Sequence, residues 1–145
     1  MEELYKTLLS GAETLTEQLK MHLFGMTESD GPVLIFVDDQ YQYCANQPGR
    51  VSFLAESEDL LQSFCCQIDD GYDPCVFKVE GGCVIGTQLA AEKTNCGYFL
   101  IYMPGYQSET IWANMDLFEL ILAQTQLICH LIEKNNLFHH ANLTH

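Results

Sequence analysis

Residues 97–135 read GYFLIYMPGYQSETIWANMDLFELILAQTQLICHLIEKN, and this stretch decides the fold expected for the chain. Its first part, Gly97–Met103, is an unbroken apolar and aromatic run that predicts a strand. Pro104-Gly105-Tyr106-Gln107 then predicts a turn, and a long helix is expected from about Ser108 to Asn135.

The expected long helix has two apolar faces. At about 100° per residue, the two faces together cover an arc of roughly 240°, whereas a helix that covers one sheet needs little more than 100°. The first face holds Leu117, Leu120, Ile121, Gln124, Leu127, Ile128 and Leu131. The second face holds Met115, Phe118, Leu122, Thr125, Cys129 and Ile132. We therefore expect this helix to pack against a second helix or a second copy of the chain, as well as on a sheet.

The two faces receive different expected roles. Residues that should pack on the sheet or on the first helix are Leu117, Ile121, Gln124, Ile128 and Leu131. Residues that should form a dimer interface are Phe118, Leu122, Thr125, Cys129 and Ile132. The periodicity also permits the two faces to be exchanged.

Composition excludes several classes of partner. The 145 residues include 20 acidic and 6 basic ones, for a net charge of −14, so nucleic acid and anionic membrane surfaces would repel the chain. No run of about 18 apolar residues is present, and the acidic start is not a secretory signal. The seven cysteines show no disulfide or zinc spacing, which favours reduced thiols in a cytoplasmic protein without a metal site.

The rest of the chain predicts a single domain with an α+β fold. A first helix is expected over residues 3–24, and a short helix should begin at Ser57. Strands are expected at Val33–Val37, Gln40–Asn46, Cys75–Val79, Cys83–Ala90 and Gly97–Met103. Because short turns join the last three strands, the central sheet of five to six strands should be mostly antiparallel, with the N- and C-terminal helices on one face. The domain should span residues 3–138, followed by a flexible tail at 139–145.

This order of helix, two strands, short helix, three strands and long helix resembles the GAF family of small-molecule sensor domains. The segments that carry the resemblance most strongly are Cys83–Leu89, Gly97–Tyr102 and Leu117–Gln124. The resemblance implies a small molecule bound on the loop-covered face of the sheet, and terminal helices that dimerise and relay strain. The motifs of the cyclic-nucleotide-binding and bilin-binding members are missing from this sequence, so no cofactor or ligand is identified.

Aromatic residues are the candidates for lining such a pocket, because tyrosine offers an apolar wall and a hydroxyl that can orient a ligand. They are Tyr41, Tyr43, Phe53, Phe64, Tyr72 and Tyr98. Each can equally be an ordinary core or rim residue. Trp112, near the start of the long helix, is expected at an interface or against the first helix.

An alternative function uses the vicinal pair Cys65-Cys66. Some GAF-fold proteins are methionine-sulfoxide reductases, and such an enzyme needs a thiolate of low pKa and a resolving thiol. The resolving thiol would have to be Cys44, Cys75, Cys83 or Cys96. No basic residue near the pair in sequence would lower a thiol pKa, so buried packing is favoured. The acidic pair Asp38-Asp39 is expected to form a solvated turn.

The sequence therefore predicts a non-catalytic sensor or regulatory module that forms a homodimer. Its expected partners are a second copy, an unidentified small molecule and a separate effector protein. A ligand-free dimerisation scaffold is the third possibility, and it differs from the sensor only in whether the loop-covered face encloses space.

Overall fold

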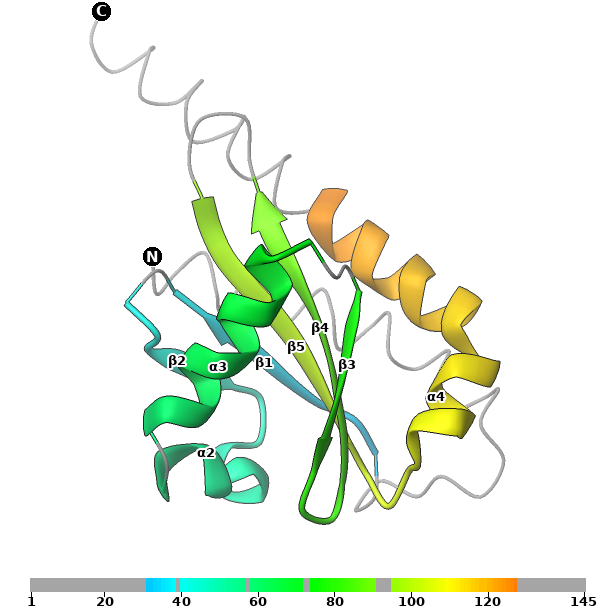
Figure 1. Cartoon of the computed structure of the whole chain (residues 1–145), viewed down its shortest axis with the longest axis horizontal. Helices are drawn as coiled ribbons and strands as arrows, with labels where there is room; N and C mark the ends of the chain where they lie inside the picture. Colours follow the sequence, from blue (N-terminus) through cyan, green and yellow to red (C-terminus); the bar gives the residue numbers. More distant parts are fainter. Residues whose placement is uncertain (1–30, 39, 57, 72–73, 91–94, 128–145) are drawn as a thin grey trace, which may run out of the picture.

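The computed structural model describes residues 31–38, 40–56, 58–71, 74–90 and 95–127 (Figure 1). The expected first helix at residues 3–24, the tail at 139–145 and the last part of the expected long helix lie outside the described residues.

A five-stranded antiparallel sheet forms the centre of the domain. Its strands are β1 (Val33–Val37), β2 (Tyr43–Ala45), β3 (Cys75–Val79), β4 (Gly82–Ala90) and β5 (Asn95–Pro104). The strand order is β2-β1-β5-β4-β3, so β5, the last of the described strands in sequence, lies between β1 and β4. The predicted α+β class with a mostly antiparallel sheet is confirmed.

The consecutive antiparallel strands β3, β4 and β5 form a three-stranded meander, and helices precede and follow it. Before it come the 3-10 helix η1 (Pro48–Val51), α2 (Phe53–Glu56) and α3 (Glu58–Asp69), and after it comes α4 (Ser108–Ala113). The chain turns at Asn114, whose side-chain amide donates to the Thr110 carbonyl at 2.9 Å, and is helical again over residues 115–127. An asparagine that bonds the preceding turn in this way competes with the regular helix ladder. We call residues 108–127 together the long helix.

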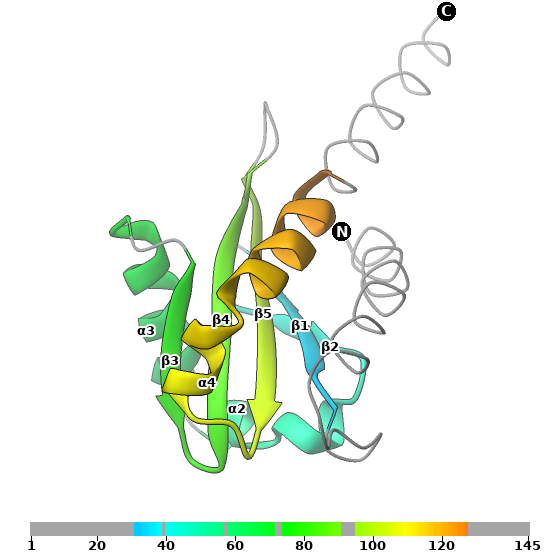
Figure 2. The same ribbon diagram turned by 90° about the vertical axis from the view of Figure 1, so that its right-hand side faces the viewer.

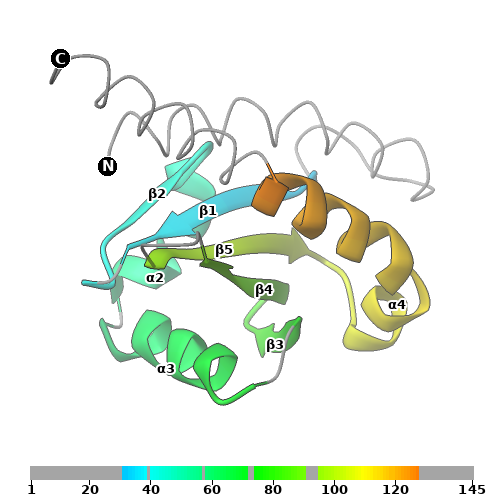
Figure 3. The same cartoon turned by 90° about the horizontal axis from the view of Figure 1, so that it is seen from above.

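The sheet lies between two helical layers, with α3 over one face and the long helix over the other (Figures 1 and 3). Figure 2 shows the long helix crossing the strands obliquely, from beside β3 toward β1. Every side chain of β1 is fully buried, and alternate residues enter the two cores. Phe36 stacks on Phe99 at 4.7 Å between ring centroids in the core under the long helix. The uninterrupted apolar run of β1 thus matches a strand that is covered on both faces.

The region after β1 differs from the predicted strand Gln40–Asn46. The Asp38 carboxylate accepts hydrogen bonds from the backbone N–H groups of Gln40 and Gln42, at 2.8 and 2.9 Å. These bonds form a turn between Asp38 and Gln42, with Tyr41 in the left-handed region at φ 61°, and leave only Tyr43–Ala45 as strand. The acidic residue therefore acts as a turn former, as predicted for Asp38.

The two faces of the long helix are exchanged relative to the expected roles. Phe118, Leu122 and Thr125 are buried within the same chain, so these residues of the predicted dimer interface are not free to meet a partner. The Thr125 hydroxyl donates to the Ile121 carbonyl at 2.8 Å, which satisfies it inside the core. The two faces are similarly apolar, so periodicity alone could not predict which one meets the sheet. In the structure, the Phe118 ring belongs to the core between the long helix and the sheet.

The other face of the long helix is largely exposed. Leu120 and Leu127 expose 45% and 57% of their surface, and Gln124 is half-buried. Leu117 is half-buried and packs against the core between the long helix and the sheet, which agrees with its predicted role. Ile121, at the boundary of the two faces, is fully buried in the core as predicted. Ile128, Cys129, Leu131 and Ile132 lie outside the described residues.

Candidate functional site

The described members of the predicted pocket aromatics belong to the core on the α3 face of the sheet, where Phe53 and Phe64 contact aromatic rings of the strands. Phe64 is buried and stacks on Phe77 with 4.3 Å between ring centroids, and Phe53 meets Tyr102 edge-on at 5.1 Å. Tyr41 and Tyr43 are half-buried against the same core, and Tyr72 lies outside the described residues. These contacts are those of a filled core, and the role of these residues as a ligand pocket stays a prediction.

A polar contact ties α3 to the central strand. The Tyr98 hydroxyl lies 2.8 and 2.7 Å from the two carboxylate oxygens of Asp69 and donates to that carboxylate. Burial, followed by this hydrogen bond, raises the pKa of Tyr98. Both effects favour the protonated phenol, so the contact fastens the end of α3 to β5.

The two members of the cysteine pair lie in different environments, and the redox role of the pair stays a prediction. Cys65 is fully buried, and burial, followed by the charges of Asp69 and Cys66, raises the pKa of its thiol to about 12. An attacking thiolate needs the opposite shift. Cys66 is exposed, and Cys44, Cys65, Cys66, Cys75 and Cys83 form no disulfide bond. Within the described part of the chain, no three His, Cys, Asp or Glu side chains are grouped so that they could hold a metal ion.

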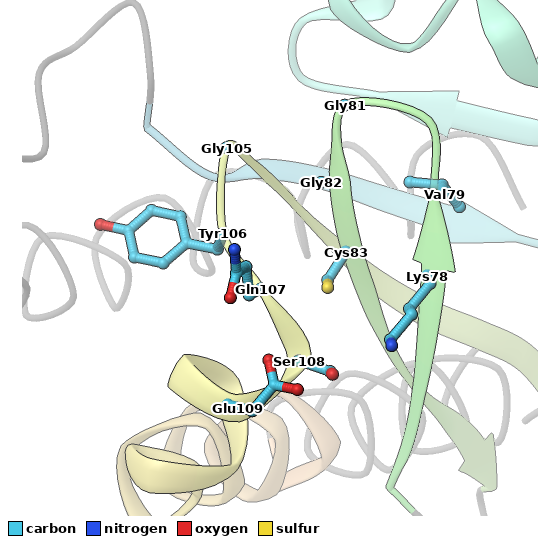
Figure 4. A pocket seen from close by; sticks show the side chains of 10 residues that line it. All are labelled: Lys78, Val79, Gly81, Gly82, Cys83, Gly105, Tyr106, Gln107, Ser108 and Glu109. Carbon is cyan, nitrogen blue, oxygen red and sulfur yellow. The ribbon is translucent and has the colours of Figure 1, made fainter.

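A hollow of about 530 Å³ lies at the other side of the domain, where the β3–β4 turn meets the start of α4 (Figure 4). We call it the hairpin hollow. It is lined by Lys78, Val79, Gly81, Gly82, Cys83, Gly105, Tyr106, Gln107, Ser108 and Glu109. Its lining therefore comes from two segments that are far apart in sequence, and the pairing of β4 with β5 brings them together.

Glycines hold the two turns against each other. Gly105 N–H donates to the Gly81 carbonyl at 2.6 Å, and both glycines adopt positive φ, 79° and 87°. At Gly82 an added Cβ would collide with the Met103 carbonyl and would lie 2.9 Å from Cα of Pro104. Only glycine allows this close backbone approach, so the hollow depends on residues that carry no side chain.

The rims of the hairpin hollow carry opposite charges. In Figure 4, Lys78 from β3 and Glu109 from α4 extend toward each other, with the Cys83 thiol on the wall between them. Burial raises the pKa of Cys83, while the charge of Lys78 opposes that shift and the charge of Glu109 adds to it. The hollow therefore offers an ammonium group, a carboxylate and the Ser108 hydroxyl to a bound molecule.

The sequence pattern did not reveal the hairpin hollow. The signal was present, because two predicted turns contain glycine, Glu80-Gly81-Gly82 and Pro104-Gly105. The register Gly82↔Pro104 places these turns side by side, and the number of residues in a predicted turn does not fix such a register.

Comparisons of the chain with protein-family models, with curated proteins and with solved structures give no match. In the described part of the chain, none of the helices has the length and apolar character needed to traverse a bilayer.

Proposed function

We propose that this chain is a non-catalytic regulatory module of the GAF-like kind that binds a small zwitterionic molecule in the hairpin hollow. The observation that carries the proposal is the pair of opposite charges, Lys78 and Glu109, on the two rims of a hollow of about 530 Å³. A molecule with a carboxylate and an ammonium group would complement both rims. Free amino acids are the simplest members of that class.

The position of the hairpin hollow supports a regulatory role. Ser108 and Glu109 form the first turn of α4, so a ligand held there would contact the long helix directly. A ligand shifts an equilibrium only through contacts that differ between two states, and the turn at Asn114 provides a place where the two helical segments can reorient. The order of elements over residues 33–127 is the order on which the GAF-like resemblance rests.

The exposed face of the long helix supports self-association. Leu117, Leu120, Gln124 and Leu127 alternate at intervals of three and four residues, the spacing of a two-helix seam with one polar position. A second copy of this helix is the partner that we propose for the seam. Cys65, Cys66 and Cys83 form no disulfide bond, which fits a reducing compartment, and we propose the cytoplasm.

The ligand proposal is tested by native mass spectrometry of the protein as purified from cells, followed by thermal unfolding with each of the twenty standard amino acids. We expect a dimer, and a rise in the unfolding midpoint with one or a few amino acids. A ligand at a hundred times its dissociation constant adds about 2.7 kcal/mol to the stability of the folded state.

Substitutions locate the binding. Lys78→Met and Glu109→Gln should each abolish the rise in midpoint, because each removes one rim charge. Glu56→Gln, an exposed carboxylate on α2, is the matched control and should leave it unchanged. No stabilisation by any amino acid, or stabilisation that survives both rim substitutions, would contradict the proposed site.

A further inference from the structure

The end strand β3 leaves one margin of the sheet open. The strand order ends at β3, and among the described residues β3 pairs with β4 alone. Figure 3 shows this strand at the end of the sheet, with α3 on one side and the long helix on the other. In such an end strand, alternate backbone N–H and C=O groups point away from the sheet and can pair with another extended chain.

A groove runs along this open margin. A hollow of about 510 Å³ is lined by Gln67 of α3, by Gly71, by residues 74–77 and by Trp112 of α4. We call it the edge groove. Its walls come from the two helices that flank β3, and its floor is the margin of the strand.

Trp112 is the most prominent side chain of the edge groove. It is the only tryptophan of the chain, and 55% of its surface is exposed. Tryptophan is enriched among the few residues that dominate the binding energy of protein interfaces, because its large ring buries much apolar surface. Half-buried Val76 lies on the strand in the same groove. An apolar side chain of a partner would be covered by these two residues.

Acidic residues lie near the edge groove without lining it. Asp116 is four residues after Trp112, beyond the turn at Asn114, and Asp70 immediately precedes Gly71 after the end of α3. Glu119 lines a neighbouring hollow of about 480 Å³ that shares Pro74 with the edge groove. All three carboxylates are exposed, and the chain as a whole carries a net charge of −14. The surroundings therefore favour a basic partner.

We propose that the edge groove binds an extended, basic peptide segment of a partner protein, which adds a strand to β3. Backbone pairing with β3 would supply affinity, and alternate side chains would supply specificity. An apolar residue would lie against Trp112 and Val76, and arginine or lysine residues would face Asp70, Asp116 and Glu119. An arginine could also stack on the Trp112 ring. The edge groove shares no lining residue with the hairpin hollow, although both adjoin β3, and the proposed peptide does not depend on a ligand in that hollow.

A second copy of the chain fits this margin less well. Antiparallel pairing of β3 with β3 of a copy would bring the acidic surroundings of the two grooves together. Like charges that face each other across a strand pair or an interface are destabilising.

The test uses the full chain and a fluorescein-labelled peptide of seven alternating arginine and valine residues. Binding is followed by the anisotropy of the label and by the emission of Trp112. We expect saturable binding with a blue shift of the Trp112 emission, and slower hydrogen exchange of the backbone amides of β3 in the complex. The same peptide with glutamate in place of arginine should not bind. A peptide with N-methyl groups on alternate residues, which cannot pair as a strand, should bind at least about tenfold more weakly.

Variants distinguish binding of the peptide in the edge groove from non-specific electrostatic attraction between a basic peptide and an acidic protein. Trp112→Ala should weaken binding about thirtyfold, and the double variant Asp116→Lys with Glu119→Lys about tenfold. The matched control, Glu56→Lys with Asp59→Lys, changes the charge equally at exposed positions on α2 and at the start of α3, and should weaken binding much less.

Three results would overturn the proposal. The first is no binding of the arginine–valine peptide, and the second is equal binding of the N-methylated peptide. The third is protection of β3 amides that rises with protein concentration when no peptide is present, which would assign the margin to a second copy.

Discussion

The two sides of the sheet are built differently. On the α3 side, the aromatic rings stack on one another and Tyr98 donates to Asp69, so the side chains satisfy each other. On the side of the long helix, an apolar core around Phe118 gives way to hollows at the margin, to an exposed Trp112 and to exposed leucines. The difference indicates that the interior of each layer specifies the fold, whereas the margin near β3 and the outer face of the long helix are available for binding.

The largest expected difference is in thiol reactivity, between the neighbouring residues Cys65 and Cys66 of α3. The pKa of Cys65 is raised from 9.0 to about 12, so its thiolate fraction near neutral pH should be about a thousandfold lower than that of an ordinary thiol. Cys66, next in sequence, is exposed. With iodoacetamide and residue-level mass spectrometry, we expect modification of Cys66 and almost none of Cys65. Rapid modification of Cys65 near neutral pH would revive the redox alternative.

The two faces of the long helix should differ strongly in their contribution to stability. Phe118→Ala removes a fully buried ring and should lower the free energy of unfolding by about 3–5 kcal/mol. Leu120→Ala, on the exposed face of the same helix, should change it by less than about 0.5 kcal/mol in the monomer. Urea denaturation of both variants measures the difference. Similar losses for the two would contradict the exchange of faces described above.

The hairpin hollow depends on a close backbone approach that a single methyl group should disrupt. Gly82→Ala should lower the free energy of unfolding by about 2–3 kcal/mol, because the new Cβ meets the backbone of Met103 and Pro104 and no flexible side chain can move away. Gly49→Ala, where an added Cβ has nothing within 4 Å, is the control and should be nearly neutral. Equal stability of the two variants in urea denaturation would show that the turns are not held together as described.

The contact between Tyr98 and Asp69 should give a smaller effect. Tyr98→Phe removes one hydrogen bond at a partly exposed carboxylate and should cost about 1 kcal/mol of stability near neutral pH. The pKa of Tyr98 is raised in the folded state above its ordinary value of 10.0, so the unfolded chain loses this proton first. The contribution of Tyr98 is therefore complete below pH 10 and declines as the pH rises further. The difference in free energy of unfolding between the unsubstituted protein and Tyr98→Phe, measured by urea denaturation at several pH values, should narrow above pH 10. A difference that stays constant above pH 10 would contradict a stabilising role of the protonated Tyr98 hydroxyl.

Much of the fold was predictable because hydrophobic patterns and turn residues act locally. The continuous apolar run at Val33–Val37 and the turn-bounded run at Cys75–Val79 gave strands with the observed limits. Other features depend on interactions that a pattern does not contain. The side chain of Asp38 shortens the next strand, and that of Asn114 interrupts the long helix.

The candidate site was less predictable than the fold. Two apolar faces of similar size left open which one meets the sheet, and only packing of Phe118 against the strands distinguishes them. The hairpin hollow requires the register of β4 on β5, which joins residues about twenty positions apart. Aromatic residues predicted a pocket on the α3 side, whereas the charged hollow arises from short turns with few apolar residues.

The central claim is that small molecules bind in the hairpin hollow and not on the α3 side of the sheet. The most direct measurement is a set of two-dimensional ¹H–¹⁵N spectra of the full chain, titrated in turn with the standard amino acids. We predict that the largest shifts occur at the backbone amides of Lys78, residues 81–83 and residues 105–109, with small changes at Tyr41, Phe53 and Phe64. Shifts concentrated on the α3 side, or no shifts with any amino acid, would contradict the claim.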